Sequence, residues 1–218
     1  MTVPSDRLAT VRAAIANAAK AARRDSAEIT LVAVSKGQDA TAIEALIEAG
    51  QRDFGENRIQ EVLDKWPALL ARHQDVRLHF IGRLQSNKAL DAVRLFSVIH
   101  SVDRPSLVGA LAQAAATEGR SPALYLQVNI GAEEQKGGCA IADVPALAAA
   151  IRDSNLDLAG LMAIPPQGGE AAPYFALLAK LAACENLGGL SMGMSGDYRE
   201  AVMLGATAVR VGRALFEE

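Results

Sequence analysis

Two hydrophobic patterns alternate along the chain, and the first of them is helical. Residues 5 to 24 carry apolar side chains at steps of three and four positions: Leu8, Val11, Ile15, Ala18 and Ala22. This spacing places them on one face and predicts an amphipathic helix, for which Ser5 is the expected N-cap. The chain is therefore expected to open with a helix that packs against the rest of the fold.

The second pattern is a short, continuous apolar run of the kind that forms a strand buried on both faces of a parallel sheet. Eight such runs follow the first helix, at residues 29–35, 52–54, 77–81, 97–101, 123–130, 156–163, 189–193 and 208–211. Helical patterns separate them, around residues 43–47, 59–66, 107–114, 144–151 and 175–181, with a weaker one at 88–93. Strand and helix therefore alternate along the rest of the chain.

Local start and stop signals agree with this order. Glycines follow three helical runs, where glycine relieves the left-handed backbone that ends many helices: Gly50, Gly119 and Gly205. Asp103 and Asp143 precede helical runs and are expected as N-caps. Pro67 is expected to kink or end the helix that begins near Asn57.

Strict alternation requires a parallel sheet covered by helices, and two common architectures provide one: an open doubly wound sheet and a closed barrel. Eight strand-helix units favour the barrel. We therefore expect an α/β fold, a single (β/α)8 TIM barrel with an extra N-terminal helix. One domain is expected to span residues 1–218.

The composition fits a packed globule and argues against several partners. Half of the residues are hydrophobic and 22% are charged, which is ample apolar surface for a core. The net charge is −3 without a basic cluster, so neither nucleic acid nor a membrane surface is an expected partner. The N-terminus lacks the apolar run of a signal peptide, and no stretch approaches a membrane span. We expect a cytoplasmic monomer or weak homodimer.

The cysteines and histidines show no metal-binding or disulfide pattern. Cys139 and Cys184 form no Cys-x-x-Cys pair and lack ligand spacing with His73, His79 or His100. Neither a zinc site nor a disulfide framework is expected. His79, on the third expected strand, is expected to be a core histidine with satisfied hydrogen bonds.

A phosphate site is expected where the last two strands end. In (β/α)8 barrels the functional site lies at the carboxyl ends of the strands, and the loops after strands seven and eight commonly bind phosphate. In residues 192–196 two glycines flank Ser195, and a short helix follows. Such a segment offers backbone N–H groups and a hydroxyl to an anion, and Gly212 after strand eight would let the backbone approach it closely. Each loop taken alone is also explained as a tight turn.

Arg210 is expected inside the barrel. Alternation along the eighth expected strand places Arg210 and Gly212 on one face and Val209 and Val211 on the other. If the valines face the helices, the guanidinium points inward, where it stays charged and needs an acceptor. The acceptor of the Arg210 guanidinium is either a carboxylate in a structural ion pair or an atom of a ligand, and the sequence favours neither.

Lys36 follows the first expected strand, where it is either a solvated surface group or a functional amine. Barrel closure makes strand one the neighbour of strand eight, which brings Lys36 near Arg210 and the phosphate loops. An amine desolvated beside another cation becomes nucleophilic and can capture an aldehyde. Lysine, phosphate cradle and buried arginine together indicate pyridoxal 5′-phosphate (PLP) as cofactor.

At these residues the chain resembles the pyridoxal phosphate homeostasis proteins, which are related to the N-terminal barrel of alanine racemase. The resemblance covers nearly the whole chain. It rests on six gap-free motifs in the family's order: LVAVSK at 31–36, FGENRIQE at 54–61, HFIGRLQSNK at 79–88, QVNI at 127–130, GLMAIP at 160–165 and LSMGMS at 190–195.

The resemblance implies a role for each site residue. Lys36 would hold PLP as a Schiff base, Ser195 and Gly212 would bind its phosphate, Arg210 would meet the pyridine nitrogen, and Asn57 would face the cofactor. The sequence departs from the family's pattern in two places. The family usually continues past the last phenylalanine with a glycine and an arginine, whereas Glu217 and Glu218 follow here. A small hydroxyl residue is common where this chain has Arg213.

The preferred function is a non-catalytic PLP-binding protein that buffers the cofactor and delivers it to PLP-dependent apoenzymes. An arginine at the pyridine nitrogen keeps that nitrogen unprotonated and weakens the ring as an electron sink. The related racemases take a second base from another domain, which we do not expect here because the sequence ends after the barrel.

Two alternatives remain open. One is an amino-acid racemase with Lys36 as one base and a second base such as Tyr198. The other is a barrel that binds a different phosphorylated metabolite without a covalent bond. Other residues are expected to have structural roles only. Trp66 is expected to pack its helix on the barrel, and Lys136 and Glu134 are expected to form a solvated pair in a loop.

Overall fold

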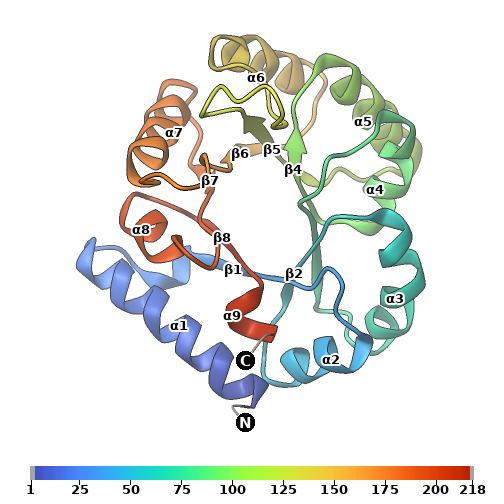
Figure 1. Ribbon diagram of the computed structural model, residues 1–218. Helices are drawn as coiled ribbons and strands as arrows, with labels where there is room; N and C mark the ends of the chain where they lie inside the picture. The colour runs from blue at the N-terminus through green and yellow to red at the C-terminus, as the bar shows by residue number, and fades with distance from the viewer. Residues whose placement is uncertain (1–2, 217–218) are drawn as a thin grey trace.

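The computed structural model describes residues 3–216, and its eight strands form a closed parallel barrel in the order β1 to β8 (Figure 1). β1 pairs with both β2 and β8, which closes the ring. The strands are β1 Thr30–Val34, β2 Asp53–Glu56, β3 Arg77–Phe80, β4 Val98–Val102, β5 Ala123–Val128, β6 Leu158–Ala163, β7 Gly189–Ser191 and β8 Ala208–Val211. The predicted (β/α)8 barrel is confirmed.

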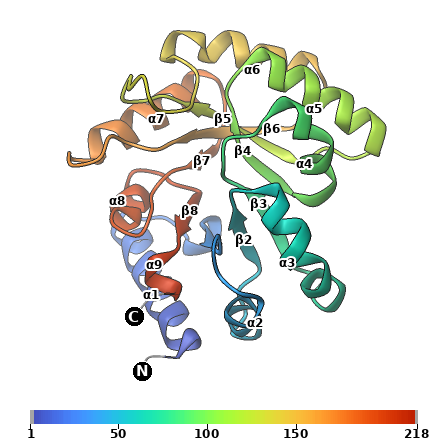
Figure 2. The same cartoon turned by 45° about the vertical axis from the view of Figure 1, so that its right-hand side comes forward.

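The helices form a ring outside the strands (Figure 1), and Figure 2 shows the same ring turned by 45°. They are α1 Pro4–Ala21, α2 Ala40–Glu48, α3 Ile59–Arg72, α4 Ala89–Leu95, α5 Pro105–Glu118, α6 Val144–Asp153, α7 Ala172–Cys184, α8 Tyr198–Met203 and α9 Arg213–Phe216. Short 3-10 turns lie at Ser26–Glu28, Ser86–Lys88 and Ile141–Asp143. No helix between residues 3 and 216 is long and apolar enough to cross a membrane.

The hydrophobic core fills the layer between the barrel and its helices. Alternate residues of each strand point outward into this layer, so Leu31 and Ala33 of β1 belong to the core cluster. Phe54 of β2 packs on Trp66 of α3 with ring centroids 5.3 Å apart, which confirms the packing role of Trp66. The other strand face looks into the barrel, and that is where the polar side chains gather.

The extra N-terminal helix is confirmed, but its predicted cap is wrong. α1 begins at Pro4 with Val3 in the N-cap position, where no side chain caps the helix, and Ser5 lies inside the first turn. Proline presets the helical backbone and has no N–H to satisfy, so the helix begins without a side-chain cap. α1 packs against α2, α8 and α9 (Figure 1). It therefore covers the seam where the first and last strands meet.

Two other local predictions need correction. Pro67 does not end its helix: α3 runs through Pro67 to Arg72, because the buried side chains of Trp66 and Leu69 hold both halves of the helix on the barrel, and a kink at Pro67 stays a prediction. Arg104, rather than Asp103, is the N-cap residue of α5, and the Asp103 carboxylate accepts a hydrogen bond from the Arg104 guanidinium.

The remaining helix signals are the N-cap expected at Asp143 and the glycines expected after three helices. Asp143 is the N-cap residue of α6 as predicted, although its side chain makes no capping bond. Gly50, Gly119 and Gly205 all adopt the predicted left-handed backbone, with φ of 94°, 62° and 106°. The glycine signals are therefore confirmed in full.

Candidate functional site at the carboxyl end of the barrel

The five residues predicted for the site lie on the loops and strand ends that the barrel brings together. Lys36 follows β1 by two residues and Asn57 directly follows β2. Ser195 lies in the loop between β7 and α8, while Arg210 lies in β8 and Gly212 directly after it. Since β1 pairs with β2 and β8, these elements are neighbours at one end of the barrel.

The loop after β7 has the shape of an anion cradle. Gly193 adopts φ +93°, and a Cβ there would lie 2.6 Å from Ala201 Cβ, so only glycine fits. Asp197 Oδ1 accepts a hydrogen bond of 2.6 Å from Met194 N, which fixes the turn. The N–H groups of Ser195 and Gly196 donate to no group among residues 3–216. They remain available to an anion.

The same cradle includes the end of β8. The Gly212 N–H points at Ser195 Oγ over 3.4 Å, so the structure brings this predicted pair together. A Cβ at Gly212 would lie 3.3 Å from Val34 O of β1, closer than most side chains pack. α8 has only six residues, so we attribute the cradle to the hydroxyl and N–H groups rather than to the helix dipole.

Lys36 is exposed, and the expectation that it is desolvated is wrong. Its amine makes no hydrogen bond or ion pair with the part of the chain that the structure describes. The backbone around it is fixed instead: Gly37 N donates to Glu61 Oε1 at 2.6 Å, and Lys65 Nζ donates to Ser35 O at 3.0 Å. A free amine thus stands on an ordered loop.

A buried carboxylate holds this loop from below. Glu56 is fully buried, and its Oε1 accepts hydrogen bonds from Ser35 Oγ at 2.7 Å and Trp66 Nε1 at 3.0 Å. Lys65 Nζ lies 2.8 Å from the same oxygen. Sequence reasoning missed these supports, although Glu56 and Glu61 lie inside one of the family motifs and could have been found there.

Arg210 points into the barrel as predicted and is 4% exposed. Its Nη1 donates to Ser191 Oγ at 2.5 Å and its Nη2 donates to Ala163 O at 3.0 Å. No carboxylate within residues 3–216 forms an ion pair with it. Burial lowers the pKa of Arg210 to about 10, against a smaller opposite effect of Asp197, so the guanidinium remains charged at neutral pH. The alternative of a structural ion pair is therefore not realised.

Asn57 is half-buried at the end of β2, and its side chain forms no hydrogen bond with the described residues. Gly82 presses on its backbone: a Cβ at Gly82 would lie 2.2 Å from Asn57 O. The backbone of Asn57 is therefore held in place while its amide stays free to meet a ligand.

The secondary candidates have different surroundings. Tyr198 is 6% exposed and lines a groove of about 510 Å³ that extends from Ser195 and Gly196 of the cradle to Asp6, Arg7 and Thr10 of α1. Lys136 pairs with Glu133 rather than Glu134. His79 is a core histidine with satisfied bonds, as predicted. No cluster of three metal-ligating side chains occurs in residues 3–216.

The fold and these residues define a (β/α)8-barrel protein with a free lysine amine beside an anion cradle and a buried, unpaired arginine. A family model described as "Alanine racemase, N-terminal domain" matches residues 9–218. Two relatives named pyridoxal phosphate homeostasis protein come from Pseudomonas aeruginosa and Escherichia coli. The first is 44% identical, and the match covers 99% of this chain and 96% of the relative. The second is 38% identical, and the match covers 96% of this chain and 94% of the relative.

Solved structures agree. PipY of Synechococcus elongatus without PLP has a TM-score of 0.87 at 39% identity, covering 97% of this chain and 99% of its own. PipY with PLP bound has a TM-score of 0.83 at 38% identity, covering 98% and 99%. Alanine racemase of Clostridium difficile shares only the fold: TM-score 0.71, 14% identity, 98% of this chain and 57% of its own. The chain belongs to the pyridoxal phosphate homeostasis protein family.

Proposed function

We propose that this protein binds PLP with its aldehyde held as a Schiff base on Lys36. One observation carries the proposal: a free amine on an ordered loop, a cradle with unused N–H donors and a buried arginine without a carboxylate lie on neighbouring strands. The names of the relatives and the PLP-bound PipY structure support it. Condensation of the lysine amine with an aldehyde forms a C=N bond and releases one water.

The residues present fit this cofactor. The hydroxyl of Ser195 and the N–H groups of Ser195, Gly196 and Gly212 would hold the phosphate. Arg210 would donate to the pyridine nitrogen, which accepts a hydrogen bond, and so satisfy a buried cation that has no anionic partner. Asn57 would face the ring with its free amide. PLP supplies an aldehyde that binds amines reversibly and a ring that can accept electrons.

We propose a carrier rather than a racemase. An arginine at the pyridine nitrogen keeps it unprotonated, which limits the ring as an electron sink. The second base considered for a racemase, Tyr198, is only 6% exposed and lies between the phosphate cradle and α1. The exposed position of Lys36 leaves the covalent bond open to solvent and to exchange with other amines. The protein would thus buffer PLP in the cytoplasm and release it to PLP-dependent apoenzymes.

Borohydride trapping tests the binding proposal. The reconstituted protein is reduced, digested and analysed by peptide mass spectrometry. We expect a phosphopyridoxyl group on the peptide that contains Lys36, no such group in Lys36→Ala, and an unchanged yield in Lys180→Ala, which removes an exposed lysine on α7. Absence of the adduct in the wild type would favour a barrel that binds another phosphorylated metabolite without a covalent bond.

A second experiment separates the carrier from the racemase. The PLP-loaded protein is incubated with L-alanine in deuterated water, and the α-proton is followed by NMR. We expect the α-proton signal to persist on the time scale in which a racemase would exchange it. Rapid loss of the signal would contradict the carrier proposal and favour an amino-acid racemase.

A further inference from the structure

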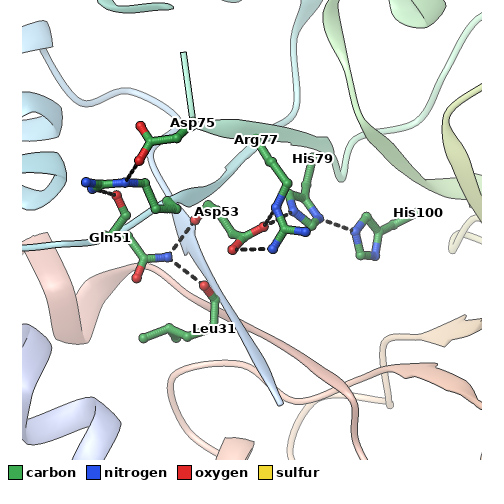
Figure 3. Close-up of polar contacts among 8 residues, drawn as sticks. Leu31, Gln51, Asp53, Asp75, Arg77, His79 and His100 are labelled. Atoms are coloured by element: carbon green, nitrogen blue, oxygen red, sulfur yellow. Dashed lines mark hydrogen bonds and ion pairs between the residues drawn. The ribbon is translucent and has the colours of Figure 1, made fainter. Parts of the chain in front are cut away.

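A chain of buried polar side chains crosses the interior of the barrel and ends at Arg210. Arg210 Nη1 lies 2.5 Å from Ser191 Oγ, and Ser191 Oγ lies 2.7 Å from His100 Nδ1. His100 Nε2 lies 2.9 Å from His79 Nδ1, and His79 Nε2 lies 2.9 Å from Asp53 Oδ1. Figure 3 shows the far half of this chain, with the two imidazoles in line. Four hydrogen bonds therefore connect the arginine of the candidate site to a carboxylate in β2.

The far end is anchored as firmly as the near end. Arg77 pairs with both oxygens of Asp53, at 2.8 and 2.9 Å. Gln51 Nε2 donates to the backbone oxygens of Leu31 and Asp53 at 2.6 and 2.7 Å, which fixes the strand that carries the carboxylate (Figure 3). Asp53 is the first residue of β2, so the chain begins at the amino end of the barrel, opposite the candidate site.

The proton positions in this chain follow from its two ends when both imidazoles are neutral. A carboxylate only accepts, so His79 Nε2 carries a proton, and a guanidinium only donates, so Ser191 Oγ accepts from Arg210. The Nδ1 of a neutral His79 must then accept, so His100 Nε2 carries the proton between the imidazoles, and His100 Nδ1 accepts from the Ser191 hydroxyl. In this order every hydrogen bond points from Arg210 toward Asp53.

An alternative order would make His79 a cation. Arg77 already neutralises Asp53, so a charged His79 would leave a further cation without compensation in the barrel, where Arg210 is already unpaired. His100 is neutral in either order, because burial holds its pKa well below 6.5, so the two orders differ in the charge of His79. The neutral order is the one consistent with the surrounding charges.

We propose that Ser191, His100, His79 and Asp53 act as positioning residues that aim the Arg210 guanidinium at the ring nitrogen of the bound cofactor. This inference rests on the proposed function, since it concerns the same pocket. The neutral His100 accepts the Ser191 proton and so turns the free lone pairs of Ser191 toward Arg210, which fixes the acceptor at which the guanidinium points. Tyr125 stacks on His100 with ring centroids 4.7 Å apart and keeps the imidazole in the plane that this chain needs.

The proton order can be tested without cofactor. In protein labelled with 15N-histidine, the ring nitrogen shifts distinguish the two neutral tautomers from the cation. We expect His79 and His100 to be neutral and protonated at Nε2 at pH 7, while the third histidine, His73, serves as an internal reference at the C-cap of α3. A cationic His79, or His100 protonated at Nδ1, would overturn the proposal.

Substitutions test whether the chain acts on the cofactor. Asp53→Asn keeps the size of the side chain but directs an amide donor at His79 or Arg77, both of which are donors. Ser191→Ala removes the acceptor next to Arg210. We expect Ser191→Ala to weaken PLP binding about tenfold or more and Asp53→Asn about threefold to tenfold. Both should shift the visible absorption band of the bound cofactor in the same direction, because the band reports the contact at the ring nitrogen.

A double variant and a matched control make the result decisive. In the Ser191→Ala background, Asp53→Asn should change PLP affinity by less than about twofold, because the connection to Arg210 is already broken. Ser101→Ala removes a buried hydroxyl of β4 that makes no hydrogen bond with the described residues, and should leave the absorption band unchanged. Additive effects in the double variant, or a Ser101→Ala shift equal to the others, would overturn the proposal. Failure of the wild type to bind PLP would instead contradict the proposed function.

Discussion

Lys65 Nζ lies 2.8 Å from Glu56 Oε1, and this pair joins α3 to the loop that carries Lys36. Both side chains are shielded from solvent, at 10% and 0% exposure. The ammonium also donates to the backbone oxygens of Ser35 and Gln38 at 3.0 and 3.3 Å. One buried ion pair therefore determines where the loop of the candidate site lies.

Lys65→Met should destabilise the fold and loosen this loop. It would leave the Glu56 carboxylate buried without a counter-charge, and its Oε2 already has no hydrogen-bond partner. Loss of one partner from a buried pair costs about 3 kcal/mol in the free energy of unfolding. Urea denaturation measures this change, and Lys88→Met is the matched control because its pair with Asp91 is on the surface. Equal effects of the two substitutions would contradict the importance of the buried pair.

Gly193→Ala should damage the phosphate cradle. The added methyl group would meet Ala201 Cβ at 2.6 Å, and the residue would keep φ +93°, so we expect a loss of about 1–3 kcal/mol in stability and weaker binding of PLP. Gly109→Ala is the control. Gly109 lies in the exposed face of α5 with nothing near its missing Cβ, so alanine there should stabilise the protein by about 0.5–1 kcal/mol. Thermal unfolding and PLP titration check both.

Stability should fall as the pH is lowered below about 6.5. The pKa of His100 is held well below 6.5 by burial and by the positive charge of Arg210. The unfolded chain therefore binds a proton that the folded chain excludes, and acid favours unfolding with a slope of at most about 1.4 kcal/mol per pH unit for one group. Urea unfolding from pH 8 to pH 5 measures the slope. In His100→Asn the slope should decrease, and an unchanged slope would contradict this origin.

The Asp53 carboxyl should affect the free energy of unfolding at a lower pH than His100 does. Burial raises the pKa of its carboxyl, but hydrogen bonds from His79 and Arg77 and the charge of Arg77 outweigh that effect and lower it below 3.8. A lowered carboxyl pKa gives stability that is present above 3.8 and is lost as pH falls through the folded value. The two groups therefore act in separate pH windows, and Asp53→Asn should remove the loss of stability below 3.8, which urea unfolding at acidic pH measures.

The two cysteines should differ sharply in reactivity. Burial is the main cause that raises the pKa of the Cys139 thiol to about 12, with a smaller effect of Asp143, whereas Cys184 is exposed at the end of α7. A thiol reagent should therefore modify one cysteine in the native protein and the second only in denaturant. Cys184→Ser should abolish the native reaction. Modification of Cys139 in that variant under native conditions would contradict the assignment.

Much of the fold was contained in local patterns. All eight predicted runs became strands, because each strand places apolar residues on the face that packs against the helices, and this pattern is visible in a short window. Alternation along β8 correctly placed Arg210 inside, and the three helix-ending glycines adopt the predicted backbone. A local signal failed where side-chain packing outweighed it: Pro67 does not end α3, which continues to Arg72.

The sequence by itself determined the order of strands and helices and the face on which Arg210 lies, because side-chain periodicity depends only on neighbouring residues. Only the tertiary structure decided which interior residues meet. His79, His100 and Ser191 come from three strands and touch only because barrel closure sets the register between them. The exposure of Lys36 and its support by Lys65 likewise depend on how α3 packs against a loop almost 30 residues away.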